Sequence, residues 1–433
     1  MKKIKLVALI LLTVLTLSSC NISSFDSENL LTSPKMNASN QQIHDALTKK
    51  IGGSYDLVYP RTGDYENAIL SVDLSGDGIA VAICFYTTEQ DKRVHMSVLE
   101  KDDGVWTVRG VANSENPGVT LDSINFFDFD KDGVKEIIVS WQYLSGEERA
   151  MNIFNYVGSK IKNLYSDIYS SLVVLDDALV TFTLSVDKDT SLRKARASII
   201  ADTGNNLGVA GTASLTSGIS SIVSVKSAYA GNDRYMIFVD EQLENASYST
   251  DVLVVNEKND VSNVTADISL ASIRNSAVVC TDVDGDGVPD FPVEKPFPSY
   301  RSGQKTENLY YMEWYSVKSG KGERLMNAYA SVNENFLLRL PDEWTDRITV
   351  QKDRSSDRRI NIYMLSSTGN VPMFCLRVFS QQEFTDDVRS QGWEKVISRG
   401  DDVFAIMCEG GTQLLPEFAV DAGRFKELFI TIK

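Results

Sequence analysis

Residues 282–291, DVDGDGVPDF, form the stretch of sequence that decides the fold. The stretch holds four carboxylates and two glycines, with an aspartate at every second position until the chain turns. Alternate residues of a tight loop can point several carboxylates at one centre, and a hard cation such as Ca²⁺ binds about six to eight oxygens. Gly287, at the sixth position, permits the sharp turn. The stretch therefore predicts a cation-binding loop.

The same plan occurs three times along the chain. Each copy has an apolar strand, an acidic loop with the pattern D-x-[DS]-x-D-G and a second apolar strand. The three copies are residues 68–86, 123–141 and 276–294. Their first loop aspartates are Asp73, Asp128 and Asp282, and the second interval is close to three times the first. We therefore expect two further copies in between, and residues 170–186 and 220–239 keep the strand-turn-strand rhythm without the acidic loop.

A second pair of strand-like runs follows each copy. The five pairs are residues 95–111, 151–165, 194–215, 250–266 and 310–329. Their turns read DDG, GS, GNN, KND and SGKG, which are residues that hairpins use for positive φ or for local side-chain hydrogen bonds. Four short strands in each of five units of roughly 50 residues predict a mainly β fold, a β-propeller of about five four-stranded blades.

The acidic copies resemble the FG-GAP or VCBS-type propeller repeat, whose mark is D-x-D-x-D-G-x-x-D between the first two strands of a blade. The resemblance covers roughly residues 60–330. A dockerin carries a similar motif, but dockerin loops lie between paired helices, whereas these loops are flanked by β-rich sequence such as EIIVSW. The resemblance implies a propeller over residues 41–330 in which structural calcium ties the strand-to-strand loops.

The candidate calcium ligands occupy positions one, three, five and nine of each acidic loop. We call residues 73–81 the first loop, 128–136 the second loop and 282–290 the fifth loop. The predicted ligands are Asp282, Asp284, Asp286 and Asp290 in the fifth loop, Asp128, Asp130, Asp132 and Glu136 in the second, and Asp73, Ser75 and Asp77 in the first. The first loop has Val81 at its ninth position, so it lacks one carboxylate and is expected to bind weakly or not at all.

The two ends of the chain differ from the repeats. Residues 1–19 carry three lysines and an apolar run and predict a secretory signal, too short to span a bilayer as a mature helix. The signal ends in LSSC, which resembles the bacterial lipobox and implies that Cys20 is acylated and anchors the chain to the cell membrane on its extracytoplasmic side. Residues 20–40 are expected to be a tether, and 331–433 a small α+β domain that weakly resembles the PsbP-type fold.

Composition excludes one class of function and leaves others open. The net charge of −16 argues against binding nucleic acid. The four cysteines after Cys20 have irregular spacing, which favours buried free thiols over a disulfide framework or a zinc site. The sequence holds two histidines and shows no hydrolase elbow, zinc-protease helix or phosphate loop, so we expect no enzyme. The basic stretch at 352–359 is the one patch that could meet an anion.

Two functions from different classes remain. The first is a binding module that recognises a protein or a glycan outside the membrane. The alternative is a propeller hydrolase or lyase that acts on an extracellular polymer, with acids gathered from several blades. Three or more acids converging in a channel would favour catalysis, and an apolar or aromatic patch would favour binding.

Overall fold

The computed structural model describes residues 38–432, apart from 144–147, 177, 187, 189, 205, 233, 299–308, 319, 354–355 and 409–413. The predicted signal, Cys20 and most of the predicted tether lie outside the described residues. The first described element is helix α2 (Ala38–Ile51), and it ends at Gly52, whose φ is 70°. Glycine adopts this left-handed conformation at helix ends because it has no Cβ. No helix within the described ranges is long and apolar enough to cross a membrane.

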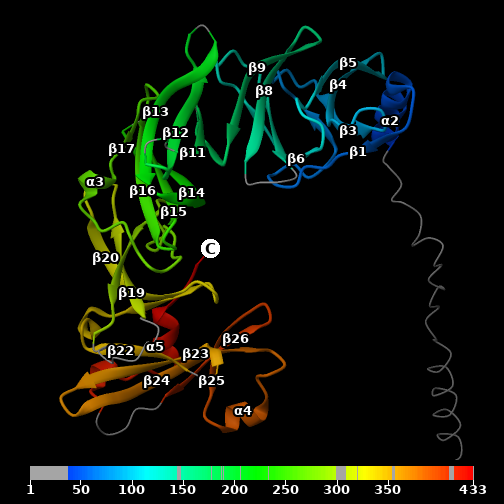
Figure 1. Ribbon diagram of the computed structural model, residues 1–433. Helices are drawn as coiled ribbons and strands as arrows, with labels where there is room; N and C mark the ends of the chain where they lie inside the picture. Colours follow the sequence, from blue (N-terminus) through cyan, green and yellow to red (C-terminus); the bar gives the residue numbers. More distant parts are fainter. Residues whose placement is uncertain are drawn as a thin grey trace, which may run out of the picture. The chain divides into compact units, whose positions relative to one another are not determined.

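The described chain is mainly β, and its strands form six antiparallel sheets that we number in chain order (Figure 1). The first sheet contains β1 (Tyr55–Leu57), β2 (Ile69–Val72), β3 (Val81–Thr88), β4 (His95–Asp102) and β5 (Val105–Asn113). The second contains β6 (Val119–Phe127), β7 (Glu136–Tyr143), β8 (Arg149–Val157) and β9 (Lys160–Tyr169). The third contains β10 (Ser171–Val174), β11 (Leu179–Val186), β12 (Arg193–Asp202) and β13 (Leu207–Ser217).

The remaining sheets continue in the same order. The fourth contains β14 (Ile219–Gly231), β15 (Arg234–Leu243), β16 (Tyr248–Asn256) and β17 (Val261–Asn263), with helix α3 (Thr265–Ile268) after it. The fifth contains β18 (Phe291–Pro296), β19 (Tyr310–Ser316), β20 (Glu323–Ser331), β21 (Phe336–Leu340) and β27 (Phe429–Thr431). The sixth contains β22 (Ile348–Asp353), β23 (Ser356–Ser366), β24 (Gly369–Ser380), β25 (Glu394–Arg399) and β26 (Asp402–Cys408). The short helices near it are η1 (Asp342–Trp344), α4 (Asp386–Ser390), η2 (Pro416–Phe418) and α5 (Ala422–Leu428).

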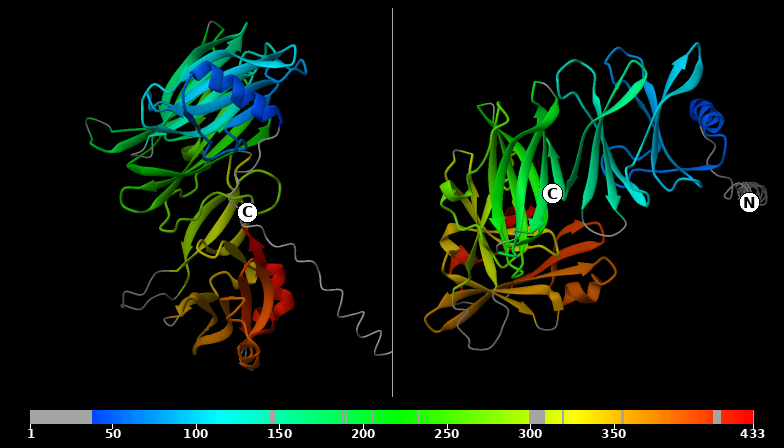
Figure 2. Two further views of the ribbon diagram at one scale, coloured as in Figure 1. Left: turned by 90° about the vertical axis from the view of Figure 1, so that its right-hand side faces the viewer. Right: turned by 45° about the horizontal axis from the view of Figure 1, so that its top comes forward.

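The predicted four-stranded units are confirmed most directly in the second, third and fourth sheets. In each of these sheets, four consecutive strands pair in chain order (Figure 2). The predicted hairpin turns also have the expected backbone. Positive φ occurs in all five of them, at Asp103 and Gly104, Gly158 and Ser159, Gly204, Asn259, and Gly320.

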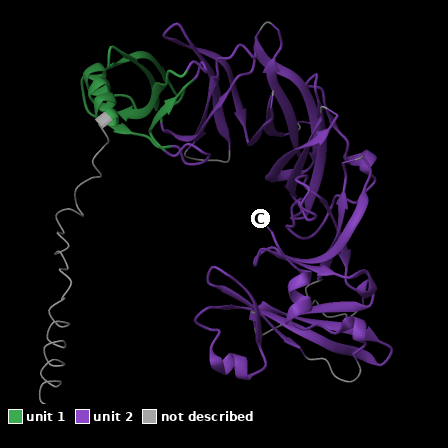
Figure 3. Ribbon diagram, turned by 180° about the vertical axis from the view of Figure 1, so that it is seen from behind, with its two compact units in different colours: residues 1–59, 67–73, 78–117 green, residues 60–66, 74–77, 118–433 purple. Residues whose placement is uncertain are grey.

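The chain divides into two compact units (Figure 3). One unit holds the first sheet and α2, and comprises residues up to 59, 67–73 and 78–117. In its core, Ile43 and Leu47 of α2 pack against Ala82, Cys84 and Leu99 of the sheet. The other unit comprises residues 60–66, 74–77 and 118–433 and holds the five remaining sheets.

Neighbouring sheets share cores within the second unit. The third and fourth sheets share one apolar cluster, and the fifth and sixth share another. Hydrogen bonding in the fifth sheet continues past residue 330, because β20 pairs with β21 and the last strand, β27, pairs with β21. Phe336 and Phe429 stack there with ring centroids 5.2 Å apart. The predicted α+β segment thus contributes two strands to the last sheet of the repeat region.

Two local predictions differ from the structure. The sequence of residues 381–396 predicts one of the helices of the α+β domain, but the structure shows only the short α4, because Gly392, with φ of 97°, ends it and the residues that follow form β25. The strand predicted before the fifth loop is only an isolated bridge between Thr281 and Asp290. Side chains of Lys226 and Asp240 in the fourth sheet, together with Arg274, bind this segment's backbone, as described below.

Cysteine side chains follow the prediction in part. Cys84, Cys280, Cys375 and Cys408 form no disulfide within the described ranges. The first three are buried as expected, whereas Cys408 is exposed. Burial raises the pKa of the Cys84 thiol to about 12, so this thiol is an inert part of the core at neutral pH.

Candidate metal centres and ligand cleft

The second and fifth loops have the same backbone hydrogen-bond pattern. In the fifth loop, Asp282 accepts hydrogen bonds from the N–H groups of Asp286 (3.1 Å) and Gly287 (2.9 Å). In the second loop, Asp128 accepts the equivalent bonds from Asp132 (3.2 Å) and Gly133 (3.0 Å). The aspartate at the first position therefore holds each turn closed with both of its oxygens.

The third and fifth positions complete this pattern. Asp284 accepts from the N–H of Asp286 at 3.1 Å, and Asp286 accepts from Val288 at 2.9 Å. The second loop repeats both bonds, from Asp132 to Asp130 (3.1 Å) and from Val134 to Asp132 (2.7 Å). The fourth position is left-handed in both loops, at Gly285 (φ 83°) and Lys131 (φ 59°). The sequence predicted the turn-permitting glycine at position six, but it did not predict that position four is left-handed.

Three of the four predicted ligands converge in each complete loop. The carboxylate oxygens of Asp282, Asp284 and Asp290 lie within 4.8 Å of one another. The oxygens of Asp128, Asp130 and Glu136 form the matching group, again within 4.8 Å. Asp286 and Asp132, at the fifth position, are not part of these groups. Throughout the described ranges, such groups of three or more potential metal ligands occur only at these two loops.

The ninth-position acids are buried beneath the loops. Asp290 is fully buried, and its Oδ2 accepts from the N–H of Val283 at 2.8 Å. Its Oδ1 is buried without a hydrogen-bond partner among the described atoms. Burial, helped by the charges of Asp284 and Asp282, raises the pKa of Asp290 to about 7. The oxygens of these three carboxylates form a donor set that fits a hard divalent ion.

Glu136 occupies the same place in the second loop. It is buried, and burial raises the pKa of its carboxyl. Its two oxygens accept from the N–H of Phe129 (3.0 Å) and from the side-chain amide of Asn155 (3.1 Å) on β8. The second loop is therefore tied both to its own turn and to the next strand of its sheet.

The first loop differs from the other two. The N–H of Gly78 donates to Asp73 at 2.9 Å, as in the complete loops. The division between the two compact units passes through this loop, with Asp73 in one unit and Ser75 and Asp77 in the other. Val81 at the ninth position begins β3 and supplies no oxygen from its side chain. No three-carboxylate group forms at this loop among the described residues.

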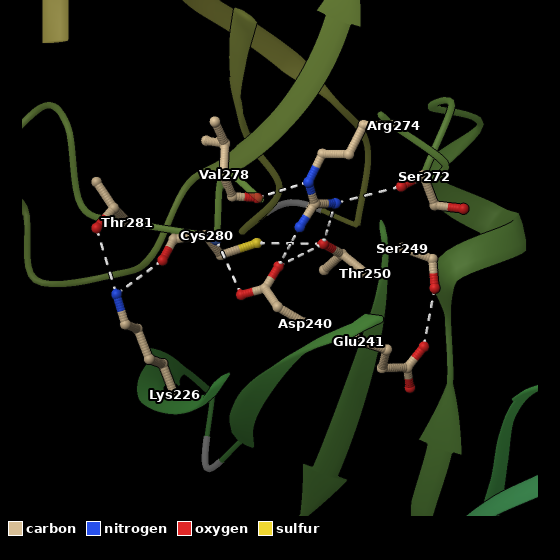
Figure 4. A network of polar contacts seen from close by, with 10 residues as sticks. All are labelled: Lys226, Asp240, Glu241, Ser249, Thr250, Ser272, Arg274, Val278, Cys280 and Thr281. Carbon is tan, nitrogen blue, oxygen red and sulfur yellow. Dashed lines mark hydrogen bonds and ion pairs between the residues drawn. The ribbon is translucent and has the colours of Figure 1, made fainter. Parts of the chain in front are cut away.

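A buried polar network fixes the segment that leads into the fifth loop (Figure 4). Arg274 and Asp240 are both fully buried and form an ion pair at 2.8 Å. Arg274 also donates to the carbonyl oxygen of Val278 (2.5 Å), and the N–H of Cys280 donates to Asp240 (2.9 Å). Lys226 of β14 donates to the carbonyl oxygen of Cys280 at 2.8 Å.

This network replaces the missing strand ladder. Arg274 bonds the carbonyl oxygen of Val278, and Lys226 and Asp240 of the fourth sheet bond the two backbone polar groups of Cys280, so the segment's backbone is satisfied without a strand partner. Sequence analysis missed the network. Its only visible signal was a single arginine in an otherwise uncharged stretch, residues 268–281.

A cleft of about 470 Å³ lies between the fifth and sixth sheets. Its wall is apolar and aromatic, and contains Tyr310, Met312, Tyr329, Phe336, Ile360, Leu376 and Val378. Its rim carries Glu334 and Arg358, and Arg358 donates to both Glu334 oxygens, at 3.0 and 2.7 Å. Arg358 also donates to Asp402 at 2.5 Å, while Arg399 donates to the carbonyl oxygen of Glu334 at 2.5 Å.

The basic stretch at 352–359 contributes to this rim. Lys352 and Arg358 both line the cleft. The charge of Arg358 is balanced by two carboxylates, Glu334 and Asp402, so this arginine is not a free anion-binding group. The rim instead presents a planar charged pair that both donates and accepts hydrogen bonds.

Comparisons with known proteins assign no family. No protein-family model matches the sequence, and no curated protein matches it. Among solved structures, the Dos1 propeller is 10% identical, with 80% of this chain and 68% of that chain covered and a TM-score of 0.28. A protein from Lactobacillus plantarum is 7% identical, with 68% and 80% covered and a TM-score of 0.26.

An exo-beta-1,3-galactanase from Phanerochaete chrysosporium, solved with beta-1,3-galactotriose, is 10% identical. The match covers 75% of this chain and 79% of that chain, with a TM-score of 0.23. These TM-scores and identities are low, and no assignment of fold or function rests on them. The structure itself shows a mainly β protein built from consecutive antiparallel sheets, several of them four-stranded.

Proposed function

We propose that this chain is a lipid-anchored, extracytoplasmic binding protein whose first five sheets are the blades of a calcium-stabilised β-propeller. Its ligand site in this proposal is the cleft between the fifth and sixth sheets. The cleft is the single observation that carries the binding role, because its volume and its mixture of apolar wall and few polar groups are typical of ligand sites.

The lining of the cleft favours a glycan. Tyr310 is half-buried and Tyr329 is buried, so each offers an amphipathic aromatic surface with one polar end. The C–H face of a sugar ring can pack on such a surface. The hydroxyl groups of a neutral sugar can bond both members of the Glu334–Arg358 pair, which offers donors and acceptors without net charge. Glu334 would repel an anionic ligand, and Arg358 would repel a cationic ligand.

The rim is held in place before any ligand arrives. Glu334 is fixed by Arg358, and the backbone of the β20–β21 turn is fixed by Arg399 through the carbonyl oxygens of Glu334 and Asn335. Binding therefore costs little ordering of side chains, which supports recognition by this surface.

A glycan array tests the binding role. The full-length protein in detergent is applied to printed oligosaccharides, and any ligand found is titrated by calorimetry against two variants. Tyr310→Ala removes an aromatic wall of the cleft and is expected to weaken binding at least tenfold. Tyr229→Ala is the matched control, because Tyr229 is 54% exposed on β14, away from the cleft lining, and should leave affinity unchanged. Absence of any glycan ligand, or equal affinity of both variants, contradicts this assignment.

The calcium part of the proposal rests on the two complete loops. Each brings three carboxylates together and buries the ninth-position acid, which self-repulsion and desolvation disfavour without a cation. In this proposal the converging acids Asp128, Asp130 and Glu136 hold one ion, and Asp282, Asp284 and Asp290 hold another. The fifth-position acids Asp132 and Asp286 complete the ligand sets when an ion binds. The ion's role is to keep the strand-to-strand turn closed.

Anchoring is proposed from sequence alone. Cys20 lies outside the described residues, and the lipobox-like LSSC is its support. Acylation at Cys20 would place residues 38–432 on the extracytoplasmic side of the cell membrane, where a glycan or protein ligand could reach the cleft.

A further inference from the structure

A lysine from a neighbouring turn reaches the fifth loop. Lys318 lies in the connection between β19 and β20, and its ammonium group forms an ion pair with the Oδ2 of Asp286. Its turn is closed by a hydrogen bond from the N–H of Gly320 to the carbonyl oxygen of Val317, at 2.9 Å. The lysine is therefore held at the fifth position of the loop, next to the three carboxylates that converge.

The second loop has no such lysine. Its backbone pattern matches that of the fifth loop, yet Asp132, the counterpart of Asp286, forms no ion pair with any described residue. The connection between β8 and β9 corresponds in chain order to the one that carries Lys318. It consists only of Gly158 and Ser159, and neither side chain can supply a charge. The difference between the loops thus arises from the length and sequence of a neighbouring hairpin turn.

The fifth loop also carries an independent sign of a cation. The Oδ1 of Asp290 is buried and has no partner among the described atoms, and this carboxylate belongs to the converging group. Lys318 does not supply that oxygen, because its ammonium group pairs with Asp286 at the other side of the turn. Lys318 thus neutralises the charge of Asp286, whereas the buried Oδ1 of Asp290 has no positive group paired with it among the described atoms.

We propose that Lys318 is an internal competitor of the cation, and that it makes the two calcium loops unequal. A cation that recruits the Asp286 carboxylate, as the full loop pattern requires, must first displace the ammonium group, and it also meets the repulsion of that group at short range. The second loop binds calcium more tightly, and the fifth loop binds it more weakly but remains partly neutralised when calcium is scarce. This inference rests on the proposed calcium-binding function.

Calcium titration of single-loop variants tests the competition. Asp130→Ala removes a ligand from the second loop, so that calorimetry on the full-length chain reports the fifth loop. In that background, Lys318→Met is expected to raise calcium affinity about tenfold, the size expected from removing a unit charge close to a dication. Lys295→Met is the matched control, because Lys295 lies in the same sheet and pairs with Glu313 at 3.6 Å, not with the loop.

The outcomes separate the two proposals. If Asp130→Ala chains bind calcium and Lys318→Met leaves the affinity unchanged or lowers it, the competitor role is wrong and calcium binding stands. If neither chain binds calcium, the fifth loop is not a calcium site and both proposals fail there. A second readout needs no metal. In excess chelator, Lys318→Met should lower the thermal midpoint relative to Lys295→Met, because Asp286 loses its only ion pair among the described residues.

Discussion

Replacing Glu241 with glutamine should make the protein more stable at neutral and alkaline pH. Glu241 lies on β15 and is fully buried, and the hydroxyl of Ser249 donates to its Oε2 at 2.9 Å. Burial, together with the nearby charge of Asp251, raises the pKa of Glu241 to about 9. The folded chain therefore keeps this carboxyl protonated at neutral pH, although the unfolded chain releases the proton.

The sign and size of the effect follow from proton linkage. Between the ordinary pKa of a glutamate and about pH 9, the folded state binds one more proton than the unfolded state at Glu241, so stability falls as pH rises through this window. One such proton lowers the free energy of unfolding by about 1.4 kcal/mol per pH unit, or at most about 4 kcal/mol between pH 5 and pH 8. Glutamine is neutral at every pH and still accepts the bond from Ser249. The variant should therefore match the wild type near pH 4 and exceed it at pH 8.

Urea unfolding from pH 4 to pH 9 measures this difference. Fluorescence of Trp141 and Trp314, both buried in the same compact unit as Glu241, reports the relevant transition. Glu244→Gln is the matched control, because Glu244 is exposed just beyond the same strand. If Glu241→Gln and the wild type lose stability in parallel across this pH range, the inference that folding keeps Glu241 protonated is wrong.

Four shorter predictions follow from other features. Excess EDTA should lower the thermal midpoint relative to millimolar calcium, and superimposable melting curves would refute structural calcium. Arg274→Met should lower the free energy of unfolding by about 3–5 kcal/mol, because Asp240 is left buried and unpaired; urea titration measures it, and Asp240→Asn added to it should recover part of the loss. Lys131→Gly should raise the free energy of unfolding by about 0.5–1 kcal/mol in calcium, because φ is 59° there; no gain would contradict the left-handed fourth position. Cys20→Ala should move the protein from the membrane fraction to the soluble fraction on immunoblots, and unchanged retention would contradict lipid anchoring.

The local features of this chain were readable from sequence because their causes are local. A hairpin turn such as Asp103–Gly104 needs positive φ, and residue types that tolerate it mark the turn in the sequence. The acidic loops were also predictable, because Asp282 and Asp128 close their own turns with backbone N–H groups only four or five residues away. The repeat spacing then placed these loops between strands.

The features that sequence reasoning missed depend on residues far apart in the chain. Arg274 finds Asp240 in the preceding sheet, and no periodic pattern marks that pair. Strand β27 pairs with β21, which lies nearly a hundred residues earlier in the chain. The chain end therefore joins a sheet of the repeat region, which was predicted to end at residue 330. The cleft likewise requires Arg358 of the sixth sheet to meet Glu334 of the β20–β21 turn. Tertiary contacts decide these features, and a single sequence does not show which contacts form.

The structure also explains why two of the repeats could lose their acidic loops. Strands β10 and β11 are joined by a tight turn in which the N–H of Leu175 donates to the carbonyl oxygen of Ala178 at 2.8 Å. Strands β14 and β15 pair up to Gly231 and Arg234, and the turn between them has Asn232 at φ of 53°. Backbone hydrogen bonds and a left-handed residue close these short connections without an ion. The second and fifth loops are longer and acidic, and their backbone bonds leave carboxylates facing one another. In the proposed calcium-binding function, a cation is needed only where the connection is too long for a hairpin turn, so metal dependence should be a property of individual sheets and not of the whole fold.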